Sequence, residues 1–80
     1  MNRFPRYPTI QRNSRGDVVK AFQRSINIVL GSRLDVHGEF DLKTEAACKQ
    51  FQKMCRIHDN GVCGQQTWAS LDIALDKLRR

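Results

Sequence analysis

Apolar side chains recur every three or four positions in three segments of this 80-residue chain, which is the spacing of one helix face. The segments run over about residues 17–30, 41–56 and 65–78. Alternating patterns typical of strands extend over only a few residues. The sequence therefore predicts an all-α fold, a compact three-helix domain with long ordered loops. The positions predicted to face inward are Val18, Phe22, Ile26 and Val29 in the first segment, Ala47, Cys48, Phe51 and Met54 or Cys55 in the second, and Trp68, Leu71, Leu75 and Leu78 in the third.

Polar residues and glycines mark the ends of these helices. Ser14 followed three residues later by Asp17 resembles a capping box for the first helix, and Gly31 is well placed to end it. The carboxylate of Asp41 can accept hydrogen bonds from the free amides near Thr44 and so cap the second helix. Long connections, about 31–40 and 57–64, join the helices. Three apolar residues are expected to anchor the first connection: Leu34, Val36 and Phe40.

Part of the first turn and second helix recurs further along the chain at a constant offset of 23 residues. The three pairs are Gly38 and Gly61, Thr44 and Thr67, and Cys48 and Leu71. An offset that holds across a turn, a cap and a core position indicates two copies of one turn-plus-helix unit. We therefore expect one domain with internal pseudo-symmetry.

Three motifs follow one another along the chain. The first is Ile10 with Ser14-Arg15-Gly16-Asp17-Val18-x-x-x-Phe22-Gln23, the second is Gly38-x-Phe40-x-x-x-Thr44-x-x-Ala47-Cys48-x-x-Phe51-Gln52, and the third is Asn60-Gly61-x-x-Gly64-x-x-Thr67-Trp68-x-x-Leu71. In this order they resemble the opening, second-helix and closing signatures of the peptidoglycan-binding domain family. His37 and Asn60 depart from the aspartate that usually precedes the glycine, and Asp41 replaces a glycine. The resemblance implies a three-helix module that docks on peptidoglycan and targets an attached wall hydrolase or phage lysin.

Length and charge refine this interpretation. Eighty residues suffice for one domain, which we place at residues 10–80 after an irregular basic tail at 1–9 interrupted by Pro5 and Pro8. The net charge of +6 belongs to residues 1–33, because residues 34–80 hold equal numbers of acids and bases. Such a field favours anionic partners, including wall polymers, and equally fits an ordinary soluble surface.

Targeting signals are weak in this chain. The longest apolar run, residues 28–30, is far too short for a membrane span, and the basic first residues lack the apolar segment of a signal peptide. We expect a monomer made in the cytoplasm, with a phage genome as one origin. It would reach the cell wall or periplasm through a partner or through lysis.

The residues with reactive side chains do not form a catalytic pattern. Cys48, Cys55 and Cys63 lack the paired short spacings of zinc sites, so we interpret them as small apolar residues, with a Cys55–Cys63 disulfide or a metal site as alternatives. His37 and His58 lie in predicted loops without a nucleophile at a revealing spacing. The sequence therefore predicts a non-enzyme without metal or cofactor.

Ligand contacts are expected in the two connections and at the start of the third helix. Their polar side chains suit glycan hydroxyls and peptide amides, and weak contacts of this kind gain affinity from repeated sites on a wall. Trp68 and Phe40 could stack on a sugar, although their positions favour the core. The candidate binding residues are Asp35, His37, Glu39, Phe40, Asn60, Gln65 and Gln66.

Two other functions fit parts of the pattern. Three helices with a basic arm are compatible with a nucleic-acid binder, but a helix-turn-helix needs a turn of about 3–4 residues and both connections here are much longer. A protein-interaction or inhibitory adaptor with the same fold is the second alternative, in which the basic first helix docks on an acidic partner.

Overall fold

The computed structural model describes residues 7–79, which contain three helices. The helix α1 spans Asp17–Leu30, α2 spans Leu42–Met54, and α3 spans Gln65–Leu78. Within residues 7–79 the only β pairing consists of two isolated antiparallel bridges, Ile10 with Cys63 and Arg15 with Glu39. The predicted all-α, three-helix fold is confirmed.

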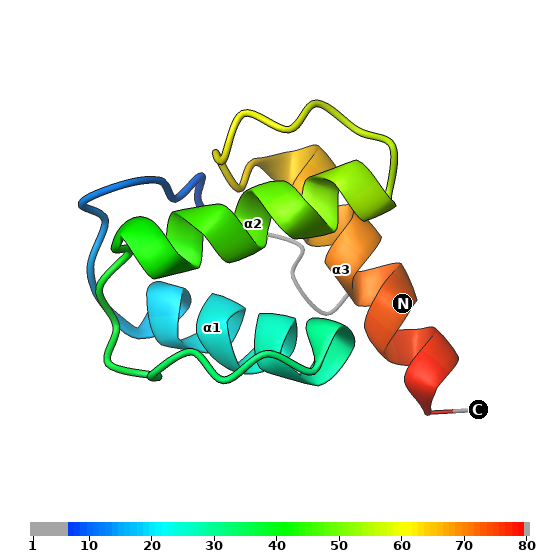
Figure 1. Cartoon of the computed structure of the whole chain (residues 1–80), viewed down its shortest axis with the longest axis horizontal. Coiled ribbons are helices and arrows are strands. Elements are labelled where there is room, and N and C mark those ends of the chain that lie inside the picture. The colour runs from blue at the N-terminus through cyan, green and yellow to red at the C-terminus, as the bar shows by residue number, and fades with distance from the viewer. Residues whose placement is uncertain (1–6, 80) are drawn as a thin grey trace.

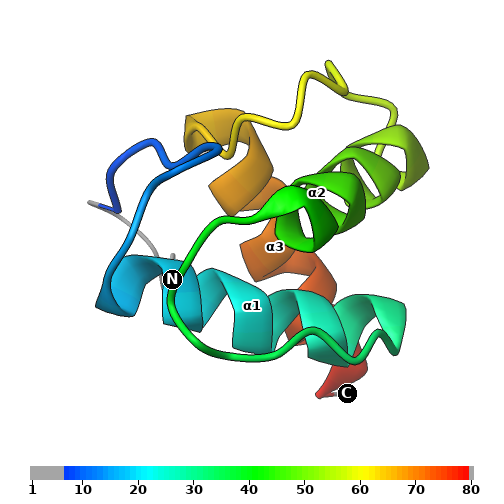
Figure 2. The ribbon, with the colours of Figure 1, turned by 60° about the vertical axis from the view of Figure 1, so that its left-hand side comes forward.

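The three helices are arranged so that α1 contacts both others (Figure 1). α1 and α2 lie side by side and run in the same direction, because the connection between them returns along α1 to its starting end (Figures 1 and 2). α3 crosses behind the pair, and the second connection arches back over the end of α2 to reach it. The connections occupy residues 31–41 and 55–64, lengths unlike the short turn of a helix-turn-helix.

Aromatic side chains form the centre of the core. The ring of Phe22 stacks on Phe40 with centroids 5.7 Å apart and meets Trp68 edge-on at the same distance. Phe51 and Leu71 complete the centre, and all five side chains are 0–1% exposed. Burying each large apolar side chain stabilises the fold by ~1.5–3 kcal/mol. The core interpretation of Phe40 and Trp68 is thereby confirmed.

The residues before α1 are part of this packing. Residues 7–9 are irregular, as predicted, and residues 1–6 of the predicted tail lie outside the described part. Tyr7 packs edge-on against Trp68 at 4.9 Å, and the Trp68 indole Nε1 donates to the carbonyl of Pro8 at 3.1 Å. Ile10 exchanges two backbone hydrogen bonds with Cys63, which ties the start of the chain to the second connection.

Several details differ from the sequence-based expectations. Met54 and Leu78 are about 60% exposed because they lie in the last turns of their helices, where no other element within residues 7–79 covers them. Val36 is also exposed rather than an anchor. The Ser14 capping box is wrong: Gly16 is the N-cap of α1 without a side-chain cap, and the Ser14 hydroxyl accepts from the backbone amide of Gln11 instead.

Candidate functional site

A buried glutamine side chain holds the first connection against α1. The Nε2 group of Gln23 donates to the Glu39 carbonyl and to the Thr44 hydroxyl, each at 3.0 Å. Its Oε1 atom accepts from the backbone amide of Gly38, also at 3.0 Å. One side chain on α1 therefore fixes both the glycine turn and the first turn of α2. We call this arrangement the first clasp.

The same arrangement recurs on α2. Gln52 donates to the Val62 carbonyl at 2.9 Å and the Thr67 hydroxyl at 3.0 Å, and it accepts from the Gly61 amide at 3.0 Å. This second clasp fixes the second connection and the first turn of α3. Each glutamine is 0–1% exposed, with its amide fully hydrogen-bonded. The predicted pseudo-repeat is confirmed, and it includes a glutamine whose role the sequence analysis missed.

The glycine of each clasp needs both its conformation and its lack of a side chain. Gly38 and Gly61 have φ of 87° and 78°, the left-handed region that disfavours other residues. A Cβ atom on Gly38 would lie 3.2 Å from the Gly16 carbonyl oxygen, and one on Gly61 would lie 3.0 Å from Cγ of Glu45. The connections therefore pass close to the rest of the chain at both glycines.

The residue before each glycine accepts a hydrogen bond from the amide two positions later. His37 does so through Nδ1, which accepts from the Glu39 amide at 3.0 Å, and Asn60 through Oδ1, which accepts from the Val62 amide at 3.0 Å. Both replace the aspartate of the family pattern and supply an acceptor as an aspartate would. Because Nδ1 of His37 accepts, its Nε2 carries the proton and donates to Asp41 at 3.1 Å.

Asp41 caps α2, as predicted. Its Oδ1 atom accepts from the Thr44 backbone amide at 2.9 Å and from the Thr44 hydroxyl at 2.8 Å. The bond from the Thr44 amide is the largest cause that lowers the pKa of Asp41, partial burial opposes it, and the Thr44 hydroxyl and His37 lower it further. At the equivalent position α3 begins after Gly64 and has no side-chain cap. The two copies therefore differ where the helix starts.

Two surface hollows flank the start of α2. The first has a volume of about 320 Å³ and the second about 250 Å³. Asp41 and Leu42 line both, and Leu42 is 65% exposed. The other residues around the first hollow are Arg33, Leu34, Asp35, His37, Lys43 and Thr44, and around the second Arg12, Asn13, Ser14, Arg15, Glu39 and Phe40.

The hollows bring together some of the predicted binding residues and not others. Asp35, His37 and Glu39 are exposed beside them, whereas the Phe40 side chain is 1% exposed and belongs to the core. The remaining three line neither hollow and belong to the second copy of the repeat: Asn60, Gln65 and Gln66. Sequence analysis missed the cations and Leu42, because only the fold of the first connection brings them to the start of α2.

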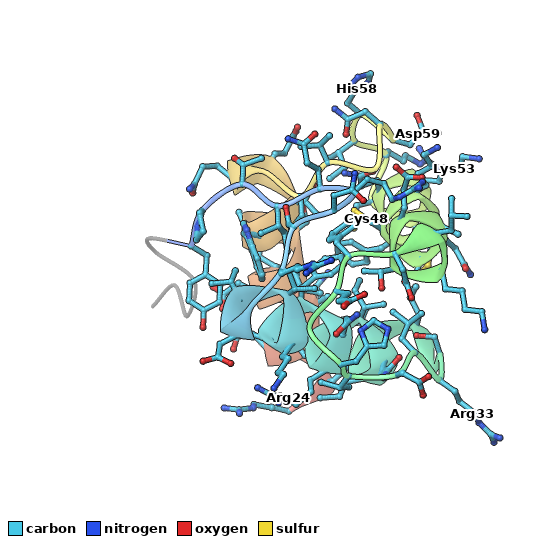
Figure 3. The ribbon with its side chains drawn as sticks, turned by 90° about the vertical axis from the view of Figure 1, so that its left-hand side faces the viewer. Arg24, Arg33, Cys48, Lys53, His58 and Asp59 are labelled. Atoms are coloured by element: carbon cyan, nitrogen blue, oxygen red, sulfur yellow. The ribbon has the colours of Figure 1, made fainter. Side chains whose placement is uncertain are left out.

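The three cysteines are free thiols, so the Cys55–Cys63 disulfide is absent. Cys48 and Cys63 are fully buried, and burial raises both pKa values, that of Cys48 to about 12. Figure 3 shows Cys48 in the interior of the molecule. Within residues 7–79 the histidine, cysteine and carboxylate side chains form no group of three that could hold a metal, and no helix there is long and apolar enough to cross a membrane.

A three-helix module with two glutamine-clasped connections and a charged surface at the start of α2 has the character of a small binding domain. The sequence comparison specifies the family. The profile described as "Putative peptidoglycan binding domain" matches residues 15–71, and the chain belongs to this family.

A curated relative and three solved structures that resemble this chain are all longer than it. An uncharacterized protein in the bpoA1 3′ region of Kitasatospora aureofaciens is 38% identical over 66 residues, 81% of this chain and 56% of its own length. A peptidoglycan-binding protein from Clostridioides difficile, solved in complex with glutamine hydroxamate, superposes with a TM-score of 0.78 at 30% identity, covering 82% of this chain and 41% of its own.

Two further solved structures extend the comparison. The endolysin of Burkholderia phage AP3 superposes with a TM-score of 0.76 at 32% identity, over 81% of this chain and 25% of its own. A periplasmic domain of the Vibrio vulnificus EpsAB fusion protein of the type II secretion system reaches 0.80 at 17% identity, over 95% of this chain and 37% of its own, and shares the fold alone. The chain thus spans about half or less of each relative.

Proposed function

We propose that this chain is a non-catalytic module that binds peptidoglycan and holds a wall hydrolase or lysin at the cell wall. Family membership is the observation that carries the proposal. Domains of this family are typically non-catalytic. The structure supports the proposal because the first clasp uses buried groups to hold the first connection, which leaves the exposed charged side chains beside α2 available for a ligand. In this proposal the module acts in the cell wall or periplasm.

Co-sedimentation tests this function directly. The purified 80-residue chain is mixed with insoluble sacculi at about 0.15 M salt and centrifuged. We expect the protein in the pellet, and release when solubilised wall fragments compete. A chain that stays wholly in the supernatant at low as well as moderate salt would contradict the proposed function, while the fold would stand.

Protein docking is a second candidate, favoured by an apolar groove of about 430 Å³ between α1 and the end of α3. Ile28 and Leu78 line it and are 61% and 59% exposed, and Arg24 and Arg79 flank it without an ion-pair partner among residues 7–79. We propose an acidic amphipathic helix as the occupant. Charge reversal by Arg24→Glu would then weaken binding of a hydrolase partner and, at about 0.15 M salt, leave wall binding unchanged.

A further inference from the structure

We infer that the hollows at the start of α2 bind the stem peptide of peptidoglycan rather than its glycan strand. This inference rests on the proposed function and assigns the part of the polymer that is recognised. The two parts differ in chemistry. The glycan presents sugar rings with hydroxyl and acetamido groups, whereas the stem peptides carry free carboxylates, small methyl side chains and, in stems with a diamino acid, an amino group.

The phenylalanine, tyrosine and tryptophan side chains of the described residues give a glycan no exposed ring at either hollow. Sugar rings bury their C–H faces on flat aromatic surfaces, which need an exposed ring. Of the five phenylalanine, tyrosine and tryptophan rings within residues 7–79, four are at most 1% exposed, and the fifth, Tyr7, is half-buried with its ring against Trp68 and lines neither hollow. The four buried rings are those of Phe22, Phe40, Phe51 and Trp68. This surface therefore lacks a stacking contact for a glycan.

Cations beside both hollows suit the carboxylates of a stem peptide. Arg33 and Lys43 flank the first hollow and Arg12 and Arg15 the second. Of these four, only Arg12 has an ion-pair partner among the described residues, an exposed contact to Glu45 at 3.5 Å. Arginine and lysine pair strongly with carboxylates, and the planar guanidinium can do so through two hydrogen bonds.

The other groups at the hollows match the rest of a stem peptide. Leu42 lines both hollows and is 65% exposed, so it offers an apolar contact to alanine methyl groups. Asp35 and Glu39 are exposed acceptors, one beside each hollow, for the amino group of a diamino acid. Cations, acceptors and one exposed apolar side chain in two adjoining hollows fit a zwitterionic peptide better than a neutral sugar chain.

The test separates the two halves of the polymer. Sacculi are cleaved with an amidase that splits the bond between glycan and peptide, and the glycan and peptide fractions are purified. Each fraction competes with intact sacculi for the 80-residue chain at about 0.15 M salt, and each is titrated into ¹⁵N-labelled protein. We expect the peptide fraction alone to compete and to shift the amide signals of Leu42 and Lys43.

A matched pair of arginine variants locates the site. Figure 3 shows Arg24 and Arg33 as separate side chains at the surface, and only Arg33 borders a hollow at the start of α2. At about 0.15 M salt, where charges outside the site are screened, we expect Arg33→Ala to weaken sacculus binding by about three- to tenfold and Arg24→Ala to leave it unchanged.

The outcomes distinguish this inference from the proposed function. Binding to intact sacculi with competition by the glycan fraction would overturn the inference and leave the function intact. Equal effects of the two arginine variants would also overturn it. No binding to intact sacculi would remove the function, and the inference with it.

Discussion

At the scale of single residues, His37 and Asn60 show what the position before each clasp glycine requires. It needs a side chain that accepts a hydrogen bond, and more than one residue type meets this need. Each side chain accepts the amide of the residue two positions later, one through an imidazole nitrogen and the other through an amide oxygen. Imidazole and amide differ in size and in titration, yet both satisfy the same backbone donor. Their departures from the aspartate of the family pattern therefore preserve the turn while changing the charge beside it.

Asp41 gives the first prediction, a pH dependence of stability. Its folded-state pKa is lowered below the ordinary value of 3.8, so ionised Asp41 stabilises the fold above that pH. The contribution is lost as the pH falls through the lower folded-state value. Asp41→Ser retains an acceptor for the cap but does not titrate. The wild-type advantage in free energy of unfolding over Asp41→Ser should therefore shrink between about pH 5 and pH 2, measured by urea unfolding.

Asp41→Ala provides the reference for the cap itself, since it removes the acceptor at every pH. We expect it to cost about 0.5–2 kcal/mol at neutral pH. A constant difference between wild type and Asp41→Ser across the acid range would contradict the assignment of the titration to this carboxylate.

The second prediction concerns thiol reactivity. The thiolate is the reactive species, and burial raises the pKa of all three thiols while completely shielding Cys48 and Cys63. Cys55 is only half-buried, and Lys77 nearby partly opposes the rise in its pKa. A negatively charged disulfide reagent at neutral pH should label one thiol in the native protein and three in denaturant. Native Cys55→Ser should react at a far lower rate, and labelling as fast as in wild type would show that a buried thiol is accessible.

At the scale of elements, the clasps explain how long connections are kept in place without strands. In both copies a helix supplies the glutamine, the following connection supplies an amide and a carbonyl, and the next helix supplies a threonine hydroxyl. Leaving a buried polar group unpaired costs about 1–3 kcal/mol, so each connection is favoured in the one conformation that satisfies the glutamine. Each helix that supplies a glutamine is thereby tied to the connection and the helix that follow it in the sequence.

The third prediction tests the clasps. Gln23→Ala and Gln52→Ala each remove several buried hydrogen bonds and leave the Gly38 or Gly61 amide unpaired, so each should cost about 2–4 kcal/mol of unfolding free energy. Hydrogen exchange should accelerate at the Gly38 amide in the first variant and at Gly61 in the second. The control is Gln50→Ala, an exposed glutamine of α2, which should change stability by less than about 0.5 kcal/mol. A clasp variant as stable as this control would contradict the role of the glutamines.

The clasps also mark the limit of what the sequence could predict. Helical spacing predicted three helices because apolar periodicity directly reports a buried face, and the offset of 23 predicted the repeat. The glutamines were missed because Gln23 lies 15 residues before its glycine and Gln52 only nine, so they break the constant offset. The Phe-Gln pair at 22–23 and again at 51–52 was the available signal. Periodicity likewise could not show that Leu78 stays 59% exposed at the end of its helix.

The candidate site was predictable in part for a related reason. Asp35, His37 and Glu39 were expected beside the first turn because they are polar residues of one connection. Arg33 and Leu42 could not be selected, since their approach to one surface depends on the path of that connection around α1. The second-copy residues, Asn60, Gln65 and Gln66, were proposed as polar residues of the second connection and the start of the third helix. The copies diverge there, because Gly64 replaces the capping carboxylate of Asp41.

At the scale of the whole molecule, charge is distributed unevenly. The net charge of +6 lies in residues 1–33, and at the start of α2 Lys43 joins three arginines of that segment on a surface that also carries carboxylates. A field of this sign raises the local concentration of an anionic polymer and speeds association, whereas contacts in the hollows set how long the complex lasts. The two contributions respond differently to salt.

The fourth prediction separates the contribution of the positive field from that of the contacts in the hollows. The Debye length falls from about 30 Å at 0.01 M salt to about 8 Å at 0.15 M, so charges outside the site act at a distance only in dilute salt. Arg24→Gln, which removes one exposed charge of the positive half, should therefore slow association with sacculi at low salt and have no measurable effect at 0.15 M. Arg33→Gln should speed dissociation at both salt concentrations, because it removes a direct contact. Surface-immobilised sacculi with a flowing protein solution give both rates. If both variants changed only the association rate, and only at low salt, the wall would be recognised through the general positive field and not through the hollows.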